Sequence, residues 1–268
     1  MKKLHALAFA FFAVFLASSA LYILQPLGGS FFIIGDSSVI VFAFLSVLCG
    51  YYAYRLHGFS SMYGKALIFI TIGLFMWFMG ETTWGIYEIA LGIEAPPVSL
   101  ADVFWLLGYP LLFAGFYVVW RTSSFPESKK TRGFASALLL VLLLIMVWLV
   151  APIWAAQDAG LLEKAVISGY VIGDVLLLMM LSVSLICLSN SRFMKPWSIV
   201  FFGLFLSSLA DIYYMNFYDV YSTGSLIDIL WNLSYLMLAY GFLYKRENVM
   251  EIVADVKSRK KTGRKGAS

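Results

Sequence analysis

The sequence predicts an all-α polytopic membrane helix bundle of about eight transmembrane helices, built as two parallel four-helix repeats with both termini in the cytoplasm. The first observation is composition: 62% of the 268 residues are hydrophobic and 13% are charged, whereas a soluble domain has roughly 25% charged residues. The second is a series of apolar segments long enough to cross a bilayer. The third is a set of polar and aromatic residues that recurs in register in the two halves of the chain.

The apolar segments define the expected helices, because a spanning helix needs roughly 20 apolar residues. The first segment follows Met1-Lys2-Lys3 and exceeds the roughly 7–15 residues of a signal-peptide core. We interpret it as a retained first helix, with cleavage near Ala20 as the alternative. The predicted spans cover residues 4–27, 33–55, 64–90, 99–120, 133–155, 165–189, 196–218 and 225–245.

Basic residues predict the orientation of these spans. With eight spans, 18 of the 19 Lys and Arg residues fall on one side of the membrane, and only Lys164 falls on the other. The positive-inside rule then places both termini in the cytoplasm, and we expect a multipass protein of the cell (plasma) membrane. Residues 257–268 hold six of the basic residues, so the net charge of +4 reflects a tail and does not indicate nucleic-acid binding.

An internal duplication is indicated by two segments that align without gaps. Residues 99–116 read SLADVFWLLGYPLLFAGF and residues 225–242 read SLIDILWNLSYLMLAYGF. Upstream, Gly80-Glu81 matches Ala210-Asp211, and Gly35-Asp36 matches Gly173-Asp174. Repeats with an even number of helices enter the membrane in the same direction and are related by a pseudo-twofold axis along its normal. The predicted organisation is a first repeat (1–121), a cytoplasmic linker (122–132), a second repeat (133–246) and a basic cytoplasmic tail (247–268).

Acidic residues inside the spans are the strongest indication of a functional site. A carboxylate costs a few kcal/mol in hydrocarbon and normally faces the bundle interior, water or a partner. Apart from Arg55, Lys65 and Lys245 at the span ends, no Lys or Arg lies inside a predicted span. The acids must therefore be protonated, bind a cation, or accept hydrogen bonds from Trp, Tyr, Ser and Thr. Six acids, all expected in the outer half of the bilayer, form this set: Asp36, Glu81, Asp102, Asp174, Asp211 and Asp228.

Each repeat places aromatic residues on the same helix face as its acids. Glu81, Trp84 and Glu88 are spaced at i, i+3 and i+7, which puts them on one stripe. The same face is shared by Asp102, Trp105 and Tyr109, by Asp211, Tyr214 and Tyr218, and by Asp228, Trp231 and Tyr235. The pattern predicts an outward-facing acidic and aromatic pocket in each repeat, or one shared pocket at the axis. The candidate ligand- or cation-binding residues are Asp36, Glu81, Trp84, Glu88, Asp102, Trp105, Tyr109, Asp174, Asp211, Tyr214, Asp228 and Trp231.

Structural explanations exist for the same residues. Asp102 and Asp228 each follow a serine and fit the first turn of a helix, where the helix dipole stabilises an acid. Glu81 and Asp211 fit hydrogen bonds between helices, and the Trp and Tyr stripes fit an outer aromatic belt. Glycines beside the acids favour close helix approach. No catalytic residue and no cofactor is predicted, because no histidine lies near the acids to complete a Ser-His-Asp triad or a His-ligated zinc site.

The tail after the last span reads RENVMEIVADV and then KSRKKTGRK. Its apolar residues at i, i+3, i+4 and i+7 predict that the last helix continues as an amphipathic cytoplasmic extension. The basic segment favours contact with anionic lipid headgroups. The residues that form the apolar stripe are Val249, Ile252, Val253 and Val256.

Residues 80–116 resemble a pattern found in archaeal and bacterial multipass membrane proteins without an assigned activity, and in the transmembrane input region of some GGDEF-type diguanylate cyclases. The matching residues are Gly80, Glu81, Trp84, Glu88, Pro97, Ser99, Leu100, Asp102, Gly108, Tyr109 and Pro110. The resemblance implies a sensory role. The chain ends about 22 residues after the last predicted span, so we expect any output to lie on a separate cytoplasmic or membrane signalling partner.

Three functional hypotheses follow from the sequence. The leading one is a non-enzymatic sensory or ligand-binding membrane module with an outward-facing acidic and aromatic site. The second is a cation- or proton-coupled transporter, suggested by unpaired acids and parallel repeats. The third is an intramembrane lipid hydrolase, because the chain is also faintly similar to eight-helix lysoplasmalogenase-like proteins, which carry Gly-Asp and Ser-Asp pairs in their helices.

Overall fold

The computed structural model describes residues 2–25, 31–93, 98–123, 128–157, 159–217 and 220–265, which form helices and no strands. Each predicted span corresponds to one helix, with ends that shift by a few residues, except that the last helix continues to Lys265. A short π-helix, η2 (Ile86–Ala90), extends α3. The α-helices are α1 (Lys2–Leu24), α2 (Phe32–His57), α3 (Met62–Gly85), α4 (Leu100–Arg121), α5 (Lys129–Ala155), α6 (Leu161–Cys187), α7 (Met194–Asn216) and α8 (Asp228–Lys265).

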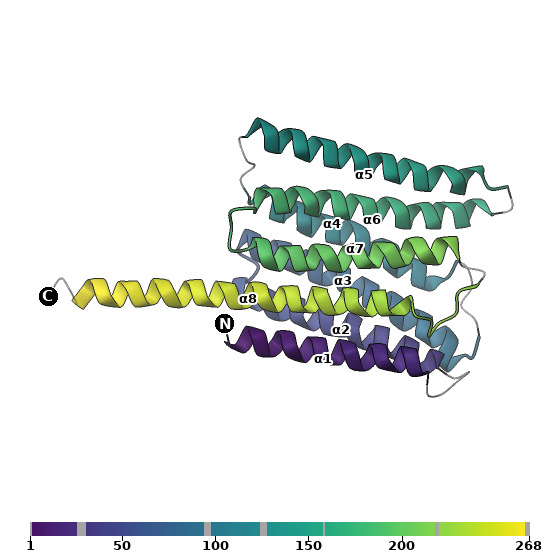
Figure 1. Cartoon of the computed structure of the whole chain (residues 1–268), viewed down its shortest axis with the longest axis horizontal. Coiled ribbons are helices and arrows are strands. Elements are labelled where there is room, and N and C mark those ends of the chain that lie inside the picture. The colour runs from purple at the N-terminus through teal and green to yellow at the C-terminus, as the bar shows by residue number, and fades with distance from the viewer. Residues whose placement is uncertain are drawn as a thin grey trace.

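Seven of the described helices, α1 to α7, are long and apolar enough to cross a membrane. The chain is therefore a multipass membrane protein. The eighth predicted span lies on α8, which falls outside this group. Its first half carries polar residues such as Asp228 and Asn232, and its second half is the charged extension. The first half of α8 nevertheless runs beside the other helices of the bundle (Figure 1).

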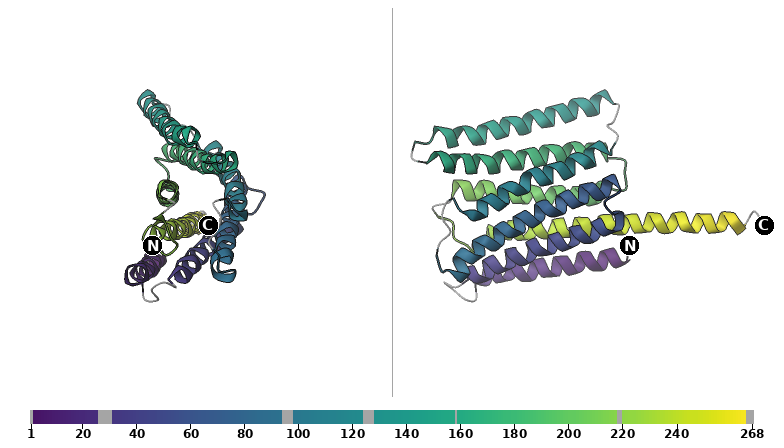
Figure 2. Two further views of the ribbon diagram at one scale, coloured as in Figure 1. Left: turned by 90° about the vertical axis from the view of Figure 1, so that its right-hand side faces the viewer. Right: turned by 180° about the vertical axis from the view of Figure 1, so that it is seen from behind.

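Six helices form a closed ring. In order around the ring, α2 contacts α3, α3 contacts α4, α4 contacts α6, α6 contacts α7, α7 contacts α8, and α8 returns to α2. The other two helices lie outside it, α1 against α8 and α5 against α6. A view along the helices shows α1 and α5 at the outer ends of the assembly (Figure 2, left). Burial agrees with this placement: 11% of the apolar stretch of α1 and 6% of that of α5 are buried, against 33–50% in α2, α3, α4, α6 and α7.

Local sequence signals set several helix ends. Ser61 begins α3 by accepting a hydrogen bond from the Gly64 amide at 2.9 Å, and Ser99 forms a capping box with Asp102 at the start of α4. These side chains satisfy amides that have no partner within the helix. At the end of α2, Gly58 adopts a φ of 66°, a conformation that costs glycine little because it has no Cβ.

A buried polar cluster joins α1 to the ring. The Asn232 amide on α8 donates to the Tyr22 hydroxyl at 3.1 Å and to Ser38 Oγ at 3.0 Å. Tyr22 is itself 1% exposed. A hydrogen-bonded polar cluster of this kind fixes the position of a helix that otherwise presents mostly apolar surface to lipid.

The second half of α8 extends beyond the bundle, at the end of the molecule where the N-terminus also lies (Figure 1). The helical continuation predicted from the tail is confirmed. Two residues of its apolar stripe, Val253 and Val256, are 45% and 49% exposed. Contacts to the bundle include the Asn248 amide donating to the Arg192 carbonyl at 3.1 Å. The side chains of residues 260–265, which carry most of the basic tail, lie outside the described residues.

Candidate functional site in the helix ring

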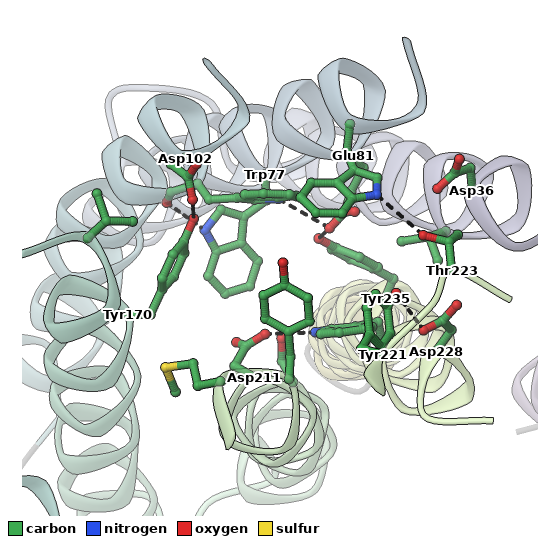
Figure 3. Close-up of a pocket in the computed structure, with 18 of the residues that line it drawn as sticks. Asp36, Trp77, Glu81, Asp102, Tyr170, Asp211, Tyr221, Thr223, Asp228 and Tyr235 are labelled. Carbon is green, nitrogen blue, oxygen red and sulfur yellow. Dashed lines mark hydrogen bonds between the residues drawn. The ribbon is translucent and has the colours of Figure 1, made fainter. Parts of the chain in front are cut away.

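A cavity of about 130 Å³ lies inside the ring, toward the end at which α8 begins. All six ring helices and the segment before α8 contribute to its wall, and Figure 3 shows how their side chains point toward one another. The lining residues are Asp36, Val39, Trp77, Glu81, Trp84, Asp102, Trp105, Tyr109, Val166, Ile167, Tyr170, Ser207, Asp211, Tyr214, Met215, Tyr221, Thr223, Asp228, Trp231 and Tyr235.

Ten of the twelve candidate residues line this one cavity. The sequence left open whether there is a pocket in each half or one shared pocket, and here acids from both halves share a single cavity. The two candidates outside the lining are Glu88 and Asp174. Asp174 lies directly behind the wall, where it accepts a hydrogen bond from the Tyr109 hydroxyl at 2.8 Å.

Tryptophan indoles donate to the central acids in both halves of the chain. Trp105 Nε1 on α4 donates to Glu81 Oε1 on α3 at 3.3 Å. At the matching positions, Trp231 Nε1 on α8 donates to Asp211 Oδ1 on α7 at 2.8 Å. Glu81 Oε1 also accepts from the Tyr235 hydroxyl at 2.7 Å, so this oxygen joins α3, α4 and α8.

The residue before an acid provides the space for its donor. A Cβ on Gly80 would lie 2.5 Å from Trp105 Nε1, the atom that donates to Glu81. A Cβ on Gly173 would overlap the ring of Tyr109, which donates to Asp174. Both glycines therefore let an aromatic ring lie flat against the helix that carries the acid, as the sequence interpretation of close approach expected.

Asp102 and Asp228 combine a structural and a lining role. Asp102 Oδ2 accepts from the Ser99 amide at 2.6 Å in the capping box, while Oδ1 accepts from the Tyr170 hydroxyl at 2.6 Å. Asp228 Oδ2 accepts from the Gly224 amide at 2.7 Å, and Oδ1 accepts from the Tyr221 hydroxyl at 2.9 Å. Each carboxylate thus fixes the start of a helix and orients a tyrosine.

Other acid oxygens have no donor. Asp36 Oδ2 and Asp174 Oδ2 are buried without a hydrogen-bond partner among the described residues. Asp36 is 5% exposed and Asp174 is 4% exposed. Asp174 also neighbours Asp211, which places two carboxyl groups side by side. Buried polar atoms normally have partners, so these oxygens call for a ligand, a proton or water.

Aromatic rings form a connected group around the cavity. The ring centroids of Trp84 lie 5.9 Å from those of Trp105 and 6.3 Å from those of Tyr214. Tyr214 in turn lies 6.2 Å from Trp231 and 5.0 Å from Tyr221. These distances fall in the range where aromatic pairs attract one another. Nine of the lining residues are Trp or Tyr, so aromatic side chains surround the acids of the wall.

No Lys, Arg or His is among the described residues that line the cavity. A buried lysine does exist in the described part of the chain, but on α8 toward the other end of the ring. There Lys245 Nζ lies 3.4 Å from His57 Nε2 and 5.2 Å from the Tyr63 ring centroid. Among the described residues, no group of three His, Cys, Asp or Glu side chains is arranged to hold a metal ion.

Several lining residues were missed by the sequence interpretation. Tyr170 precedes Asp174, and Trp77 precedes Glu81, by one helical turn, a spacing that could have revealed both. Tyr221 and Thr223 lie before α8 and carry no such signal. Tyr235 was recognised on its stripe but not selected as a candidate. Two residues considered from the sequence, Pro97 and Tyr218, lie outside the described residues.

Comparisons with known proteins give no further guide to this site: no protein-family model, no curated protein and no solved structure matches the chain.

Proposed function

We propose that the chain is a ligand-binding membrane module with a sensory role, and that the cavity in the helix ring is its ligand site. The observation that carries the proposal is the gathering of five acids and nine aromatic residues from all six ring helices around one cavity. Pockets with convergent polar groups in an apolar scaffold are the usual form of small-molecule sites. At about 130 Å³ the cavity is close to the size of an engineered cavity that binds benzene, roughly 150 Å³.

Helix α8 supports the sensory part of the proposal. Its first residue, Asp228, lines the cavity, and the same helix runs without interruption to Lys265 beyond the bundle. A ligand that shifts the first turns of α8 therefore acts on the segment that projects from the other end. This continuous helix is the element through which a cytoplasmic or membrane signalling partner would receive the signal.

The duplication belongs to the same proposal. Suppose that α2, α3 and α4 of the first repeat correspond to α6, α7 and α8 of the second. The helix contacts of the ring then occur in matching pairs: α2–α3 with α6–α7, α3–α4 with α7–α8, and α4–α6 with α8–α2. The matched indole bonds to Glu81 and Asp211 follow the same relation. In this arrangement the ligand site lies between the repeats, faces outward, and leaves the basic tail at the cytoplasmic membrane surface.

A compound screen tests the proposal. The purified protein in lipid nanodiscs is screened against small polar and aromatic compounds by thermal unfolding and by tryptophan emission. Four of the eight tryptophans line the cavity, so occupancy is expected to change the emission. A ligand at one hundred times its Kd raises the free energy of unfolding by about 2.7 kcal/mol.

Matched variants separate the cavity from other surfaces. Ser207→Phe places a phenyl ring in the cavity, whereas Ser198→Phe adds the same ring on α7 outside the lining. We expect compounds that stabilise the wild type to stabilise Ser198→Phe and to lose their effect on Ser207→Phe. Compounds that act equally on all three proteins, or a screen with no stabilising compound, would contradict the proposed function.

A proton- or cation-coupled transporter is the second candidate, and the paired carboxyls favour it. Asp174 neighbours Asp211 at the cavity wall and has a buried oxygen without a partner among the described residues. Like charges this close favour a shared proton. Reconstituted liposomes with imposed H⁺ or Na⁺ gradients test this function: flux that is abolished by Asp174→Asn and Asp211→Asn supports it, and no flux above empty liposomes rejects it.

A further inference from the structure

We propose that the ligand of the cavity is a small organic amine that binds as a protonated ammonium ion; the inference rests on the proposed function and names its ligand class. Three independent features of the wall carry it. They are the excess of hydrogen-bond acceptors over donors, the sign of the charge, and the aromatic surfaces. Each excludes a different group of alternatives.

The first feature is the acceptor excess. Asp102 and Asp228 have donors on both oxygens, so they belong to the framework. Asp36 Oδ2 has no hydrogen-bond donor among the described residues, although Asp36 is 5% exposed and lines the cavity. The two donors to Glu81 both bond Oε1, which leaves Oε2 to accept from a ligand. A ligand that satisfies these oxygens must bring its own N–H or O–H donors.

The second feature is charge. In the described part of the chain, five carboxyl groups line the wall, and no Lys, Arg or His does. An anionic ligand would meet like charges at short range in a medium of low dielectric constant, which is strongly unfavourable. A cation with N–H donors supplies both the missing charge and the missing hydrogen bonds.

The third feature distinguishes an organic cation from a metal ion. Ca²⁺ takes six to eight oxygen ligands that converge on one point, and the described residues contain no group of three acidic, His or Cys side chains so arranged. The wall instead presents rings such as Trp84, Trp105 and Tyr214 in contact with one another. Ring faces attract ammonium groups through the cation–π interaction.

The size of the cavity limits the ligand. A volume of about 130 Å³ is close to that of an engineered cavity of roughly 150 Å³ that binds benzene, so the ligand is a small amine. A free amine and the ethanolamine headgroup of a phospholipid carry the same primary ammonium chemistry. The ammonium group in the cavity can therefore belong to a free amine or to a lipid headgroup, and the experiment below distinguishes these two sources.

The experiment measures tryptophan emission of the wild type in nanodiscs made of phosphatidylcholine. The probes are benzylammonium, its neutral isostere benzyl alcohol, and tetramethylammonium, which is charged but has no N–H donor. We expect benzylammonium to bind at least tenfold more tightly than either control compound. Nanodiscs that also contain phosphatidylethanolamine identify the source: weaker apparent binding there supports a lipid headgroup, and unchanged binding supports a free amine.

Two acid variants test the site. Glu81→Gln keeps an acceptor for Trp105 and Tyr235 but removes the charge, so the fold is retained and the preference for benzylammonium over benzyl alcohol is expected to fall at least tenfold. Asp255→Asn removes an exposed acid on the α8 extension and is expected to change nothing. The melting temperature of each variant, measured in parallel, confirms that it is folded.

The outcomes distinguish this inference from the proposed function. If benzyl alcohol binds as tightly as benzylammonium or more tightly, and Ser207→Phe abolishes this binding, the amine is rejected as the ligand class. The cavity then remains the ligand site. If Ca²⁺ competes with benzylammonium in the wild type but not in Glu81→Gln, the ligand of the site is a metal ion and not an amine. If benzylammonium does not bind, the amine is rejected, and the wider compound screen with Ser207→Phe decides the ligand site independently.

Discussion

At the residue scale, two buried acids are each paired with an aromatic donor from a neighbouring helix, and a glycine makes room for that donor. Trp105 reaches Glu81 across Gly80, and Tyr109 reaches Asp174 across Gly173. The small residue, the acid and the donor therefore act as one unit. Changing any of the three is expected to affect the other two.

The glycine of this unit gives the first prediction. Gly80→Ala brings a Cβ within 2.5 Å of Trp105 Nε1, and overpacking of this kind typically costs about 1–3 kcal/mol. Gly133→Ala is the matched control, because a Cβ there meets nothing within 4 Å and stabilises by about 0.4–1 kcal/mol. Thermal unfolding in nanodiscs measures both. Equal melting temperatures for the two variants would show that Trp105 is not held against Gly80.

The donor gives the second prediction. Tyr109→Phe removes the hydroxyl that bonds Oδ1 of the buried Asp174, and the loss of a donor to a buried acid costs about 1–3 kcal/mol. Tyr117→Phe removes a hydroxyl from the same helix at a residue that is 43% exposed, and a change below about 0.5 kcal/mol is expected. Unfolding of the two variants is compared directly. A loss of similar size in both would exclude a structural role for the Tyr109–Asp174 bond.

The sequence predicted most of these acids and part of their surroundings. Periodicity places Trp105 and Tyr109 on the face of Asp102, because residues three and seven apart share a helix face. Their actual hydrogen-bond partners, Glu81 and Asp174, lie on other helices. Such partners depend on which helices are neighbours, and a pattern within one helix does not contain that information.

At the scale of elements, the helices divide into a ring and two outer members. Length and hydropathy indicate that α1 to α7 can span a membrane, but they do not separate α5 from the ring helices, since lipid and protein interior both accept apolar side chains. The arrangement therefore had to come from the structure. Glycines and polar residues mark the ring helices, and α5, with its almost continuous aliphatic sequence, has little to specify a protein partner.

This division predicts different sensitivities to cavity-forming substitutions. Leu112 on α4 is fully buried and Leu144 on α5 is 59% exposed. Leu112→Ala is expected to cost about 2–5 kcal/mol, whereas lipid chains fill the space left by Leu144→Ala, which is expected to cost much less. Thermal unfolding in nanodiscs measures the difference. A large loss for Leu144→Ala would mean that α5 packs against another protein surface, such as a second copy of the chain.

At the scale of the whole molecule, the site exists only because the ring closes. The cavity takes Glu81 from the first half of the chain and Asp211 from the second, and Tyr235 from the second half bonds Glu81 in the first. Neither half alone encloses the cavity. The choice between one pocket and two was therefore not available from the sequence, because it depends on contacts between segments more than one hundred residues apart.

The orientation of the whole molecule decides which compartment the cavity faces, and it can be tested with single cysteines. Cys49→Ala and Cys187→Ala remove the two native thiols. Val220→Cys then reports the end near the start of α8, where Val220 is 75% exposed, and Asn190→Cys reports the opposite end, between α6 and α7. Because the basic residues cluster at the Asn190 end, the positive-inside rule places that end in the cytoplasm.

A membrane-impermeant thiol reagent is expected to label Val220→Cys in intact cells and Asn190→Cys only after permeabilisation. The reverse pattern would turn the cavity toward the cytoplasm, and an external amine could then no longer reach it without crossing the membrane.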